Sequence, residues 1–427
     1  MIQFLDNLVQ KKKEPSNGVR SLTRKGLATR AAILDTAHQV FKDTGYYGSS
    51  ISEITRRCGI SMGNFYQYFK NKEQVFLELS DLILSRFMAR AEILTATQGP
   101  FEKRLEEAIR LLYEHTRENF AFHRILGESE LTDRVTIAYY EAMARHYRDF
   151  FRREAQAGHL RPLDPNMVAY GLIGICYFHS LEWGEKEKIS PREAIRQMSD
   201  LILHGVNGPA RWKKSFEGRQ LSLPDPIPLH APKGEPLTKG ENTRQTIFRA
   251  AEKVIGRHGI NRANISEITR EAGVALGTFY VHFGSKRDLI DGLVKYINSQ
   301  MRRELQRRVA RTKDRRDAER VGMLSFYEFL RKHREVYRVV PECEMIDREV
   351  SLWYYKKMAQ GYIQGLQQGM ERGEIRKLPA VFLARSLMGL IHFIGLKWIV
   401  WNTGSQPGIP PHILKDMLTL IICGLKP

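Results

Sequence analysis

The sequence repeats itself at an offset of 214 positions. The segment Ile51-Ser-Glu-Ile-Thr-Arg56 recurs as Ile265-Ser-Glu-Ile-Thr-Arg270, which makes six identities in a row. The same ungapped offset matches further residues of both segments: Thr29-Arg30 with Thr243-Arg244, Gly45 with Gly259, Gly59 with Gly273, Gly63 with Gly277, Phe65-Tyr66 with Phe279-Tyr280, Phe69 with Phe283 and Lys72 with Lys286. A period of about 200 residues is too long for a solenoid, so the chain holds two domain-sized units.

The match continues at lower density towards the end of each unit. Tyr113 aligns with Tyr327. After one inserted residue, Gly174 aligns with Gly389 and Phe178 aligns with Phe393. Between the units, residues 208–236 contain repeated prolines, which cannot donate the hydrogen bonds of a regular helix. This segment is the predicted linker, with a reach of about 100 Å when fully extended. The expected domains are 22–80 and 81–207, then 237–294 and 295–427.

Charge and cysteine content narrow the class of protein. Lysine and arginine number 67 against 48 acidic residues, which gives a net charge of +19 and favours a polyanionic partner. The four cysteines are widely spaced, so neither a zinc site nor a disulfide scaffold is indicated. The N-terminal lysines follow a stretch of mixed polarity, the reverse of a secretory signal. We therefore expect a cytoplasmic protein.

Apolar residues recur at helical spacing along both units, which predicts an all-α fold. The pattern predicts a helix over 31–44 that ends at Gly45, where a left-handed residue is favoured. Ser49 or Ser50 would begin a second helix that runs to about Arg57, and Ser61 would begin a third helix over 62–69. Further helices are expected at 73–95, 102–118, 133–157, 166–183 and 191–206. In the second unit Asn264 takes the capping place, and the third helix covers 276–283.

Helix, four-residue turn and helix form the arrangement by which many proteins read DNA. The residues Ile54-Thr-Arg-Arg-Cys-Gly-Ile-Ser61, then Met62-Gly-Asn-Phe-Tyr-Gln-Tyr-Phe69 and Lys72, resemble the N-terminal signature of the tetracycline-repressor (TetR) family of bacterial regulators. The second copy, Ile268 to Phe283 with Lys286, resembles it equally. Thr55, Thr269 and Cys58 replace alanines of the signature, and two copies in one chain depart from the family's usual single copy.

The resemblance implies that the third helix of each unit enters the major groove and that Tyr66, Lys72, Tyr280 and Lys286 contact phosphates. Asn64 and Gln67 suit adenine, because an amide offers both a donor and an acceptor. Ser49, Ser50 and Arg30 lie where the backbone could be met, although a capping role in folding weighs equally. The expected DNA-binding residues are Arg30, Ser49, Ser50, Ser61, Met62, Gly63, Asn64, Tyr66, Gln67, Tyr68 and Lys72 in the first unit, and Arg244, Asn264, Leu276, Gly277, Thr278, Tyr280, Val281, His282 and Lys286 in the second.

The resemblance implies that 81–207 and 295–427 are helical regulatory domains. Aromatic residues are frequent in both, and most of them are expected in ordinary cores. The remainder would line an apolar pocket with a few polar anchors, the usual form of a small-molecule site. The candidate effector-pocket residues are Tyr113, Phe120, Tyr140, Tyr177, Tyr327, Tyr337, Tyr354 and His392. Glycine-bearing apolar helices, 166–183 and 380–401, match the family's interface helices, which predicts an intramolecular pseudo-dimer; a homodimer of chains is the alternative.

The sequence therefore predicts a DNA-binding transcriptional regulator, by family habit a repressor released by an unknown small-molecule effector, with double-stranded DNA as its partner. Neither a nucleophile with its base, a metal-spaced histidine cluster nor a phosphate-cradling glycine loop occurs, so we expect no enzyme, metal or cofactor. Two rivals stay open. One is a ligand-sensing scaffold in which only one head binds DNA, with Val281 casting doubt on the second. The other is a membrane-surface protein that uses the apolar stretch 381–401, although Arg385, His392 and Lys397 interrupt it.

Overall fold

The computed structural model describes residues 23–95, 99–126, 131–181, 189–213, 238–337, 339–340, 343, 347–402 and 408–427. Within these ranges the regular structure is helical. The β-type pairing there is a single isolated antiparallel bridge between Asn207 and Ile375. The all-α prediction is thus confirmed. Of the proline-rich segment, residues 214–236 lie outside the described ranges.

The first unit contains a head of three helices followed by a helical body. Its helices are α2 (Arg24–Gly48), α3 (Ile51–Cys58), α4 (Met62–Tyr66), α5 (Lys72–Thr95), α6 (Phe101–Glu118), α7 (Phe120–Ile125), α8 (Leu131–Gln156), α9 (Pro165–Ser180) and α10 (Pro191–His204). The helix predicted over 31–44 is longer than expected, and it continues across a kink at Gly45, whose φ of 74° is left-handed as predicted.

The second unit follows the same order. Its helices are α11 (Lys239–Arg262), α12 (Ile265–Ala272), α13 (Leu276–His282), α14 (Lys286–Val309), α15 (Arg315–Lys332), α16 (Arg334–Tyr337), α18 (Arg348–Glu371), α19 (Ala380–Gly395) and α20 (Pro411–Cys423). A π-helical turn, η1 (Leu396–Val400), continues α19. Helix starts are fixed by local chemistry: Thr238 and Glu241 form a reciprocal capping box at α11, and Asp314 caps α15.

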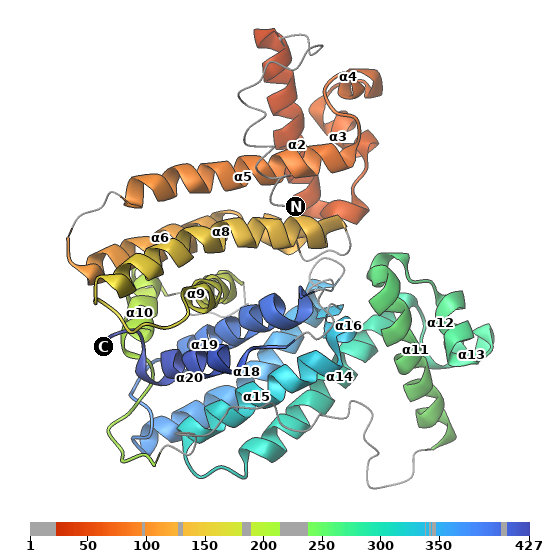
Figure 1. The fold of residues 1–427 in the computed structure, drawn as a ribbon. Coiled ribbons are helices and arrows are strands. Elements are labelled where there is room, and N and C mark those ends of the chain that lie inside the picture. The colour runs from red at the N-terminus through yellow and green to blue at the C-terminus, as the bar shows by residue number, and fades with distance from the viewer. Residues whose placement is uncertain are drawn as a thin grey trace.

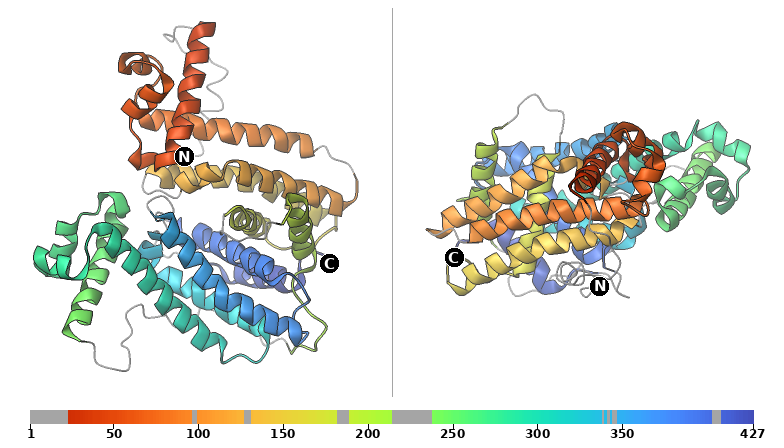
Figure 2. Two further views of the ribbon diagram at one scale, coloured as in Figure 1. Left: turned by 180° about the vertical axis from the view of Figure 1, so that it is seen from behind. Right: turned by 90° about the horizontal axis from the view of Figure 1, so that it is seen from above.

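The bodies of the two units stack as layers, and both heads lie towards the same side of these layers (Figures 1 and 2). In Figure 1 the first head, α2 to α4, stands above α5, and the second head, α11 to α13, lies beside the N-terminal end of α14. Helix α14 begins at Lys286, directly after the second head, and runs into the body. The second head is therefore directly continuous with a helix of the body.

Helices α9 and α19 form the central contact between the units. They cross where Gly174 meets Gly389: a Cβ atom on Gly174 would lie 2.1 Å from the carbonyl oxygen of Gly389, and one on Gly389 would lie 2.2 Å from that of Gly174. Only glycine permits this approach of two helix backbones. Around the crossing Tyr177 packs on Phe393, with ring centroids 5.3 Å apart.

Backbone hydrogen bonds join the units in a nearly two-fold pattern. The amide of Arg376 donates to the carbonyl of Val206 (2.9 Å), and the amide of the matching residue Arg161 donates to that of Leu425 (2.8 Å). Beside them, the amide of Gly208 donates to Glu374, so the first residues of the predicted linker pack on the second unit. The two units thus form one continuous structure within the chain.

The apolar stretch that ends in η1 lies inside this interface. Ala380–Val400 is long and apolar enough to cross a membrane by length and composition, but 61% of that apolar window is buried within the molecule. Its contacts with α9 and α18 account for that burial. Within the described part of the chain, the stretch therefore serves as a core helix.

Candidate nucleic-acid interface and ligand cavity

The first head is built on a small apolar core. Ile54, Phe65 and Phe69 are buried, and α3 packs against both α2 and α4. Gly59, at φ 70°, makes the turn between the two short helices, and the hydroxyl of Ser61 accepts the amide of Asn64 at the start of α4. The cap of α3 is Ser50. Ser49, the other candidate, is buried and its hydroxyl donates to the carbonyl of Tyr46 at 2.6 Å, so it faces away from solvent.

Helix α4 presents several side chains to solvent. Met62 is 42% exposed and Tyr66 is 53% exposed, while Gln67 is exposed and Asn64 and Tyr68 are half-buried. The regular helix ends at Tyr66 rather than at Phe69, because the backbone after it tightens: the amide of Tyr68 donates to the carbonyl of Phe65, three residues back. Gln67 and Tyr68 thus extend from this tightened turn.

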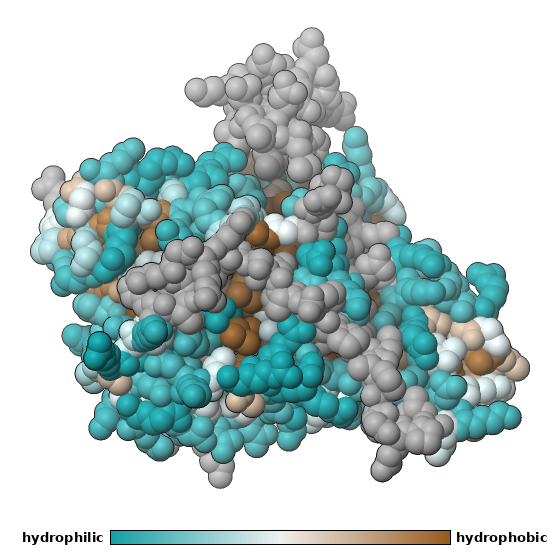
Figure 3. Space-filling view, turned by 60° about the horizontal axis from the view of Figure 1, so that its bottom comes forward, coloured by the Kyte–Doolittle hydropathy of each residue, from teal (hydrophilic) through white to brown (hydrophobic). Residues whose placement is uncertain are grey.

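The second head repeats this geometry with different exposed residues. Asn264 caps α12 by accepting the amide of Glu267 at 2.8 Å, and Gly273 makes the turn at φ 67°. Ala275 stands where Ser61 stands in the first head and supplies no side-chain cap. Leu276, Tyr280 and Val281 are 50%, 54% and 80% exposed. In the space-filling view a pale-to-brown patch lies at the right of a largely hydrophilic face, on the side of the second head (Figure 3).

Large exposed apolar side chains concentrate on the two heads. Six of the eight in the described chain belong to them: Leu27, Met62, Tyr66, Leu276, Tyr280 and Val281. Apolar side chains that gather on one exposed surface mark interaction sites more often than those scattered singly. Tyr66 and Tyr280 occupy matching positions and each ring packs edge-on against the preceding phenylalanine. The two heads therefore offer surfaces of the same design.

Lys72 and Lys286 support the heads from inside. The Nζ atom of Lys72 donates to the carbonyls of Tyr46 (2.6 Å) and Ser49 (2.8 Å). Lys286 donates in the same way to Ile260, Asn261 and Ala263. Burial lowers the pKa of Lys286. These ammonium groups satisfy carbonyls at the end of the first helix, a role that the sequence-based assignment to phosphate did not anticipate.

Arg30 and Arg244 match in sequence but differ in partners. Each guanidinium lies over the phenylalanine that follows the reading helix, 4.8 Å from the ring centre of Phe69 and 4.6 Å from that of Phe283. Arg30 also pairs with Glu78. The position that matches Glu78 is Gly292, so this carboxylate is absent beside Arg244. Arg244 is therefore the more available of the two for a phosphate.

One ion pair occurs in both heads with its charges exchanged. In the first head Arg57 on α3 pairs with Asp43 on α2 at 2.5 Å. In the second head the matching positions hold Glu271 on α12 and Arg257 on α11, 3.3 Å apart. The contact recurs in both units although both residues differ. The arginine thus lies on α3 in the first head and on α11 in the second head.

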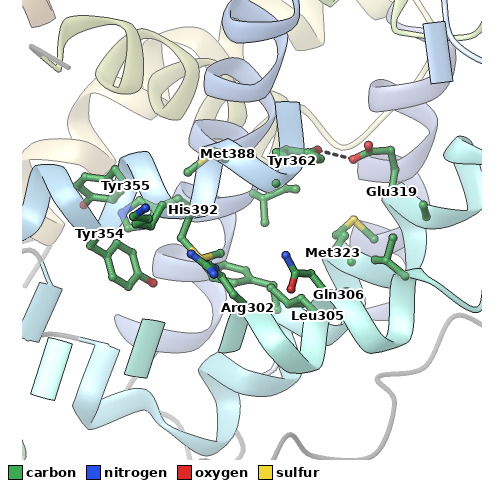
Figure 4. A pocket seen from close by; sticks show the side chains of 18 of the residues that line it. Arg302, Leu305, Gln306, Glu319, Met323, Tyr354, Tyr355, Tyr362, Met388 and His392 are labelled. Atoms are coloured by element: carbon green, nitrogen blue, oxygen red, sulfur yellow. Dashed lines mark hydrogen bonds between the residues drawn. The ribbon is translucent and has the colours of Figure 1, made fainter. Parts of the chain in front are cut away.

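A cavity opens in the body of the second unit, between α14, α15, α18 and α19 (Figure 4). It holds about 1020 Å³ of space not filled by atoms, including open solvent at its mouth. Its wall is apolar over much of its extent, with Leu305, Met323, Met388 and Ile391 among the lining residues. Phe178, which comes from α9 of the first unit, completes the wall. The cavity therefore borders the contact between the units.

Two sets of hydrogen-bonded polar side chains lie in this wall. The carboxylate of Glu319 accepts from the guanidinium of Arg315 at 2.5 Å and from the hydroxyl of Tyr362 (Figure 4). Gly365 and Gly369 make room for this arginine, because a Cβ on either would lie within 2.7 Å of its side chain. On the opposite side Tyr337 bonds to His392, whose pKa burial lowers to about 3. The histidine is therefore neutral.

The predicted pocket residues divide between the cavity and the core. Tyr337, Tyr354 and His392 line the cavity. Tyr327 is fully buried beside it, and its hydroxyl donates to the carbonyl of Ile391 at 3.0 Å. The candidates of the first unit do not line this cavity: Tyr113, Tyr140 and Tyr177 are buried, and Phe120 is partly buried against the same core.

Sequence reasoning missed the charged residues of the cavity. Arg302, Arg315, Glu319 and Lys357 all line it, although they lie in helices that read as ordinary amphipathic segments. One signal was available in the spacing of Gly361, Gly365 and Gly369, which places three glycines on one face of α18. Such a row predicts a close neighbour, but it does not identify Arg315 as that neighbour.

Comparison with known proteins places both heads in one family. The family model described as "Bacterial regulatory proteins, tetR family" matches residues 33–79 and 247–293. The uncharacterized HTH-type transcriptional regulator YhgD of Bacillus subtilis is 21% identical over 176 residues, which cover 40% of this chain and 92% of that protein. The fatty acid metabolism regulator protein of the same organism is 37% identical over 60 residues, 14% of this chain and 31% of that protein.

Among solved structures, a transcriptional regulator FadR from Bacillus subtilis in complex with stearoyl-CoA matches with 18% identity and a TM-score of 0.36. The match covers 40% of this chain and 96% of that one.

Proposed function

Because the chain belongs to the tetR family of bacterial regulatory proteins and carries the family's DNA-binding domain twice, we propose that it is a cytoplasmic repressor whose units act as a pseudo-dimer on an operator with two unlike halves. A small-molecule effector in the second unit releases it from DNA. One observation carries the proposal: two heads of the same backbone design expose different side chains at matching positions.

The solvent-accessible residues of α4 and α13 favour different bases. The first head offers Asn64 and Gln67, whose amides suit adenine. The second head offers Thr278 and Val281 at the matching places, and their methyl groups suit contact with the thymine methyl. A homodimer imposes a palindrome because identical helices meet identical half-sites. Two unlike heads in one chain remove that requirement.

Pairing of a first unit with a second unit, rather than of two second units, is supported by the charges across the interface. Lys397 of the second unit bonds to the carboxylate of Glu141 in the first at 2.6 Å, and the hydroxyl of Tyr170 donates to the same oxygen. The position that matches Glu141 in the second unit is Lys356. If two second units paired with each other, Lys397 would meet a lysine in place of a carboxylate. Like charges disfavour that pairing.

Two routes lead from the cavity to the second head. Arg302 and Leu305 line the cavity on α14, which begins directly at the head. Tyr337 lines it on α16, and α16 packs against α11, the first helix of the same head. A ligand that separates α14 from α18 would shift both contacts. We therefore place the release step in the second unit.

Selection of bound sequences from random duplexes tests the proposal. We expect an operator with unlike halves, about one helical turn apart, and salt-dependent binding that reflects the phosphate contacts. The double variant Thr278→Asn, Val281→Gln gives the second head the amides of the first, so it should move the selected operator towards symmetry. A perfect palindrome recovered with the unaltered chain would contradict the assignment of two unlike heads, and a half-site alone would favour a chain with one functional head.

Sedimentation of the dilute protein provides the second arm. The pseudo-dimer predicts one chain per particle, because the two units already satisfy each other's interface. A stable dimer of chains at nanomolar concentration would show instead that the units pair between chains.

A further inference from the structure

The charges that line the cavity do not cancel. Arg315 is neutralised by Glu319, to which it is bound in the wall. Arg302 and Lys357 line the same space without a carboxylate partner among the described residues; the Nζ atom of Lys357 lies 3.5 Å from the amide oxygen of Gln360. Arg302 and Gln306 lie side by side on α14 in Figure 4 and point into the cavity. The lining thus has two uncompensated cations beside an apolar interior.

Such a lining fits one class of ligand. An apolar chain or ring system would replace water against Leu305, Met323, Met388 and Ile391, where burial of apolar surface is favourable. An anionic head would meet Arg302 and Lys357, since cations lacking a protein carboxylate bind carboxylate or phosphate strongly. A cationic ligand would face repulsion from both. Neutral His392 adds no charge to either balance.

The first unit lacks both features at the matching positions. Met88 and Ala142 stand where the second unit has Arg302 and Lys357, so the cations are missing. Phe101 replaces Arg315, Leu105 replaces Glu319 and Phe150 replaces Gly365. All three replacements are buried in the core of the first unit. Large apolar side chains thus occupy the region in which the second unit combines a buried ion pair with a row of glycines.

We propose that the chain binds one amphiphilic anion, in the second unit only, while the first unit has given up ligand binding for a filled core. This inference rests on the proposed function in taking the cavity as the effector site, and it adds the ligand's chemistry and its stoichiometry. Phe178 gives the first unit a direct contact with the site: its ring lies 5.3 Å from that of His392 and 5.4 Å from that of Tyr355, measured between centroids.

Titration calorimetry of the full chain tests the proposal with defined probes. Decanoate and decyl phosphate serve as anions with two kinds of head, and decyltrimethylammonium serves as the cation with the same tail. We expect one anion bound per chain, and binding of the cation at least about tenfold weaker. The tighter of the two anions identifies the head group. Two anions per chain, or equal affinity for the cation, would overturn the proposal.

Variants test separately the cationic side chains of the cavity and its empty volume. Arg302→Gln and Lys357→Gln should each weaken anion binding about tenfold. Arg303→Gln on the same helix is the matched control, because Arg303 is exposed and does not line the cavity. Gly322→Leu should abolish binding by filling the cavity, since a Cβ there meets only Val309 at 3.7 Å. Undiminished anion binding in Gly322→Leu would place the anion elsewhere and overturn the proposal.

DNA binding measured on the same preparations distinguishes the two levels of the argument. Gly322→Leu should still bind operator DNA but no longer be released by the anion. A chain that binds DNA but no anion would overturn this inference alone. A chain that fails to bind DNA at all would overturn the proposed function, whatever the calorimetry gives.

Discussion

At the scale of single residues, Lys72 shows how one side chain can serve folding where its sequence position points to DNA. Its ammonium group bonds to two carbonyls at the end of α2 and lies 4.4 Å from the centre of the Tyr46 ring. Lys72→Met should therefore lower the free energy of unfolding by about 1–3 kcal/mol. Tyr66→Phe should leave stability unchanged and weaken binding to all DNA sequences alike, because its hydroxyl is assigned to phosphate.

Urea unfolding and binding to two unrelated duplexes, measured for both variants, check this pair of expectations. Unchanged stability of Lys72→Met would mean that water replaces the ammonium group at those carbonyls. A loss of affinity in Tyr66→Phe that is confined to one DNA sequence would assign Tyr66 to the bases instead.

At the scale of elements, the crossing of α9 and α19 is the central contact between the units. Alanine normally favours a helix over glycine by about 1 kcal/mol. At Gly174 the sign should reverse, because the new Cβ would meet a backbone carbonyl that cannot move aside. We expect Gly174→Ala to destabilise the protein by about 1–3 kcal/mol or more. Gly171→Ala is the matched control, since its Cβ would meet the Leu390 side chain at 3.3 Å. Equal thermal unfolding of the two variants would contradict the close crossing.

At the scale of the whole molecule, three buried histidines and the half-buried His179 make stability depend on pH. Burial lowers the pKa of His115 to about 4 and those of His179 and His392 to about 3, and it holds that of His123 well below 6.5. The unfolded chain therefore binds protons that the folded chain does not accept. Stability is complete above pH 6.5 and falls as pH drops towards the folded values, by up to about 1.4 kcal/mol per pH unit for each histidine.

Urea unfolding at about pH 7.5, 6 and 5 should reveal this slope. His179→Gln removes one titrating group and should reduce the slope by the share of one proton, because His179 bonds to Ser386 as a neutral ring. A stability that stays constant over this range would show that the folded protein admits these protons without cost.

Local features of the fold were predictable where the chemistry is local. The Gly45 break, the Ser61 and Asn264 caps and the two glycine turns each depend on residues within a few positions, and the structure confirms them. The helix predicted over 62–69 is three residues too long, because α4 ends at Tyr66, where the backbone tightens. No residue preference marks that end. The partners of Arg30 and Lys72 lie 48 and at least 23 positions away, beyond what periodicity reports.

By itself the sequence determined that this protein is all-helical, that it consists of two related units, and that each begins with a helix-turn-helix. These properties follow from repeats, caps and spacings that are complete within short segments. Only the tertiary structure decided which aromatic side chains line a cavity and which fill a core. Tyr354 and Tyr139 hold matching positions, yet the first borders open space and the second is enclosed. The difference arises from the volumes of residues on other helices, such as Gly365 against Phe150, which meet these positions only after the chain has folded.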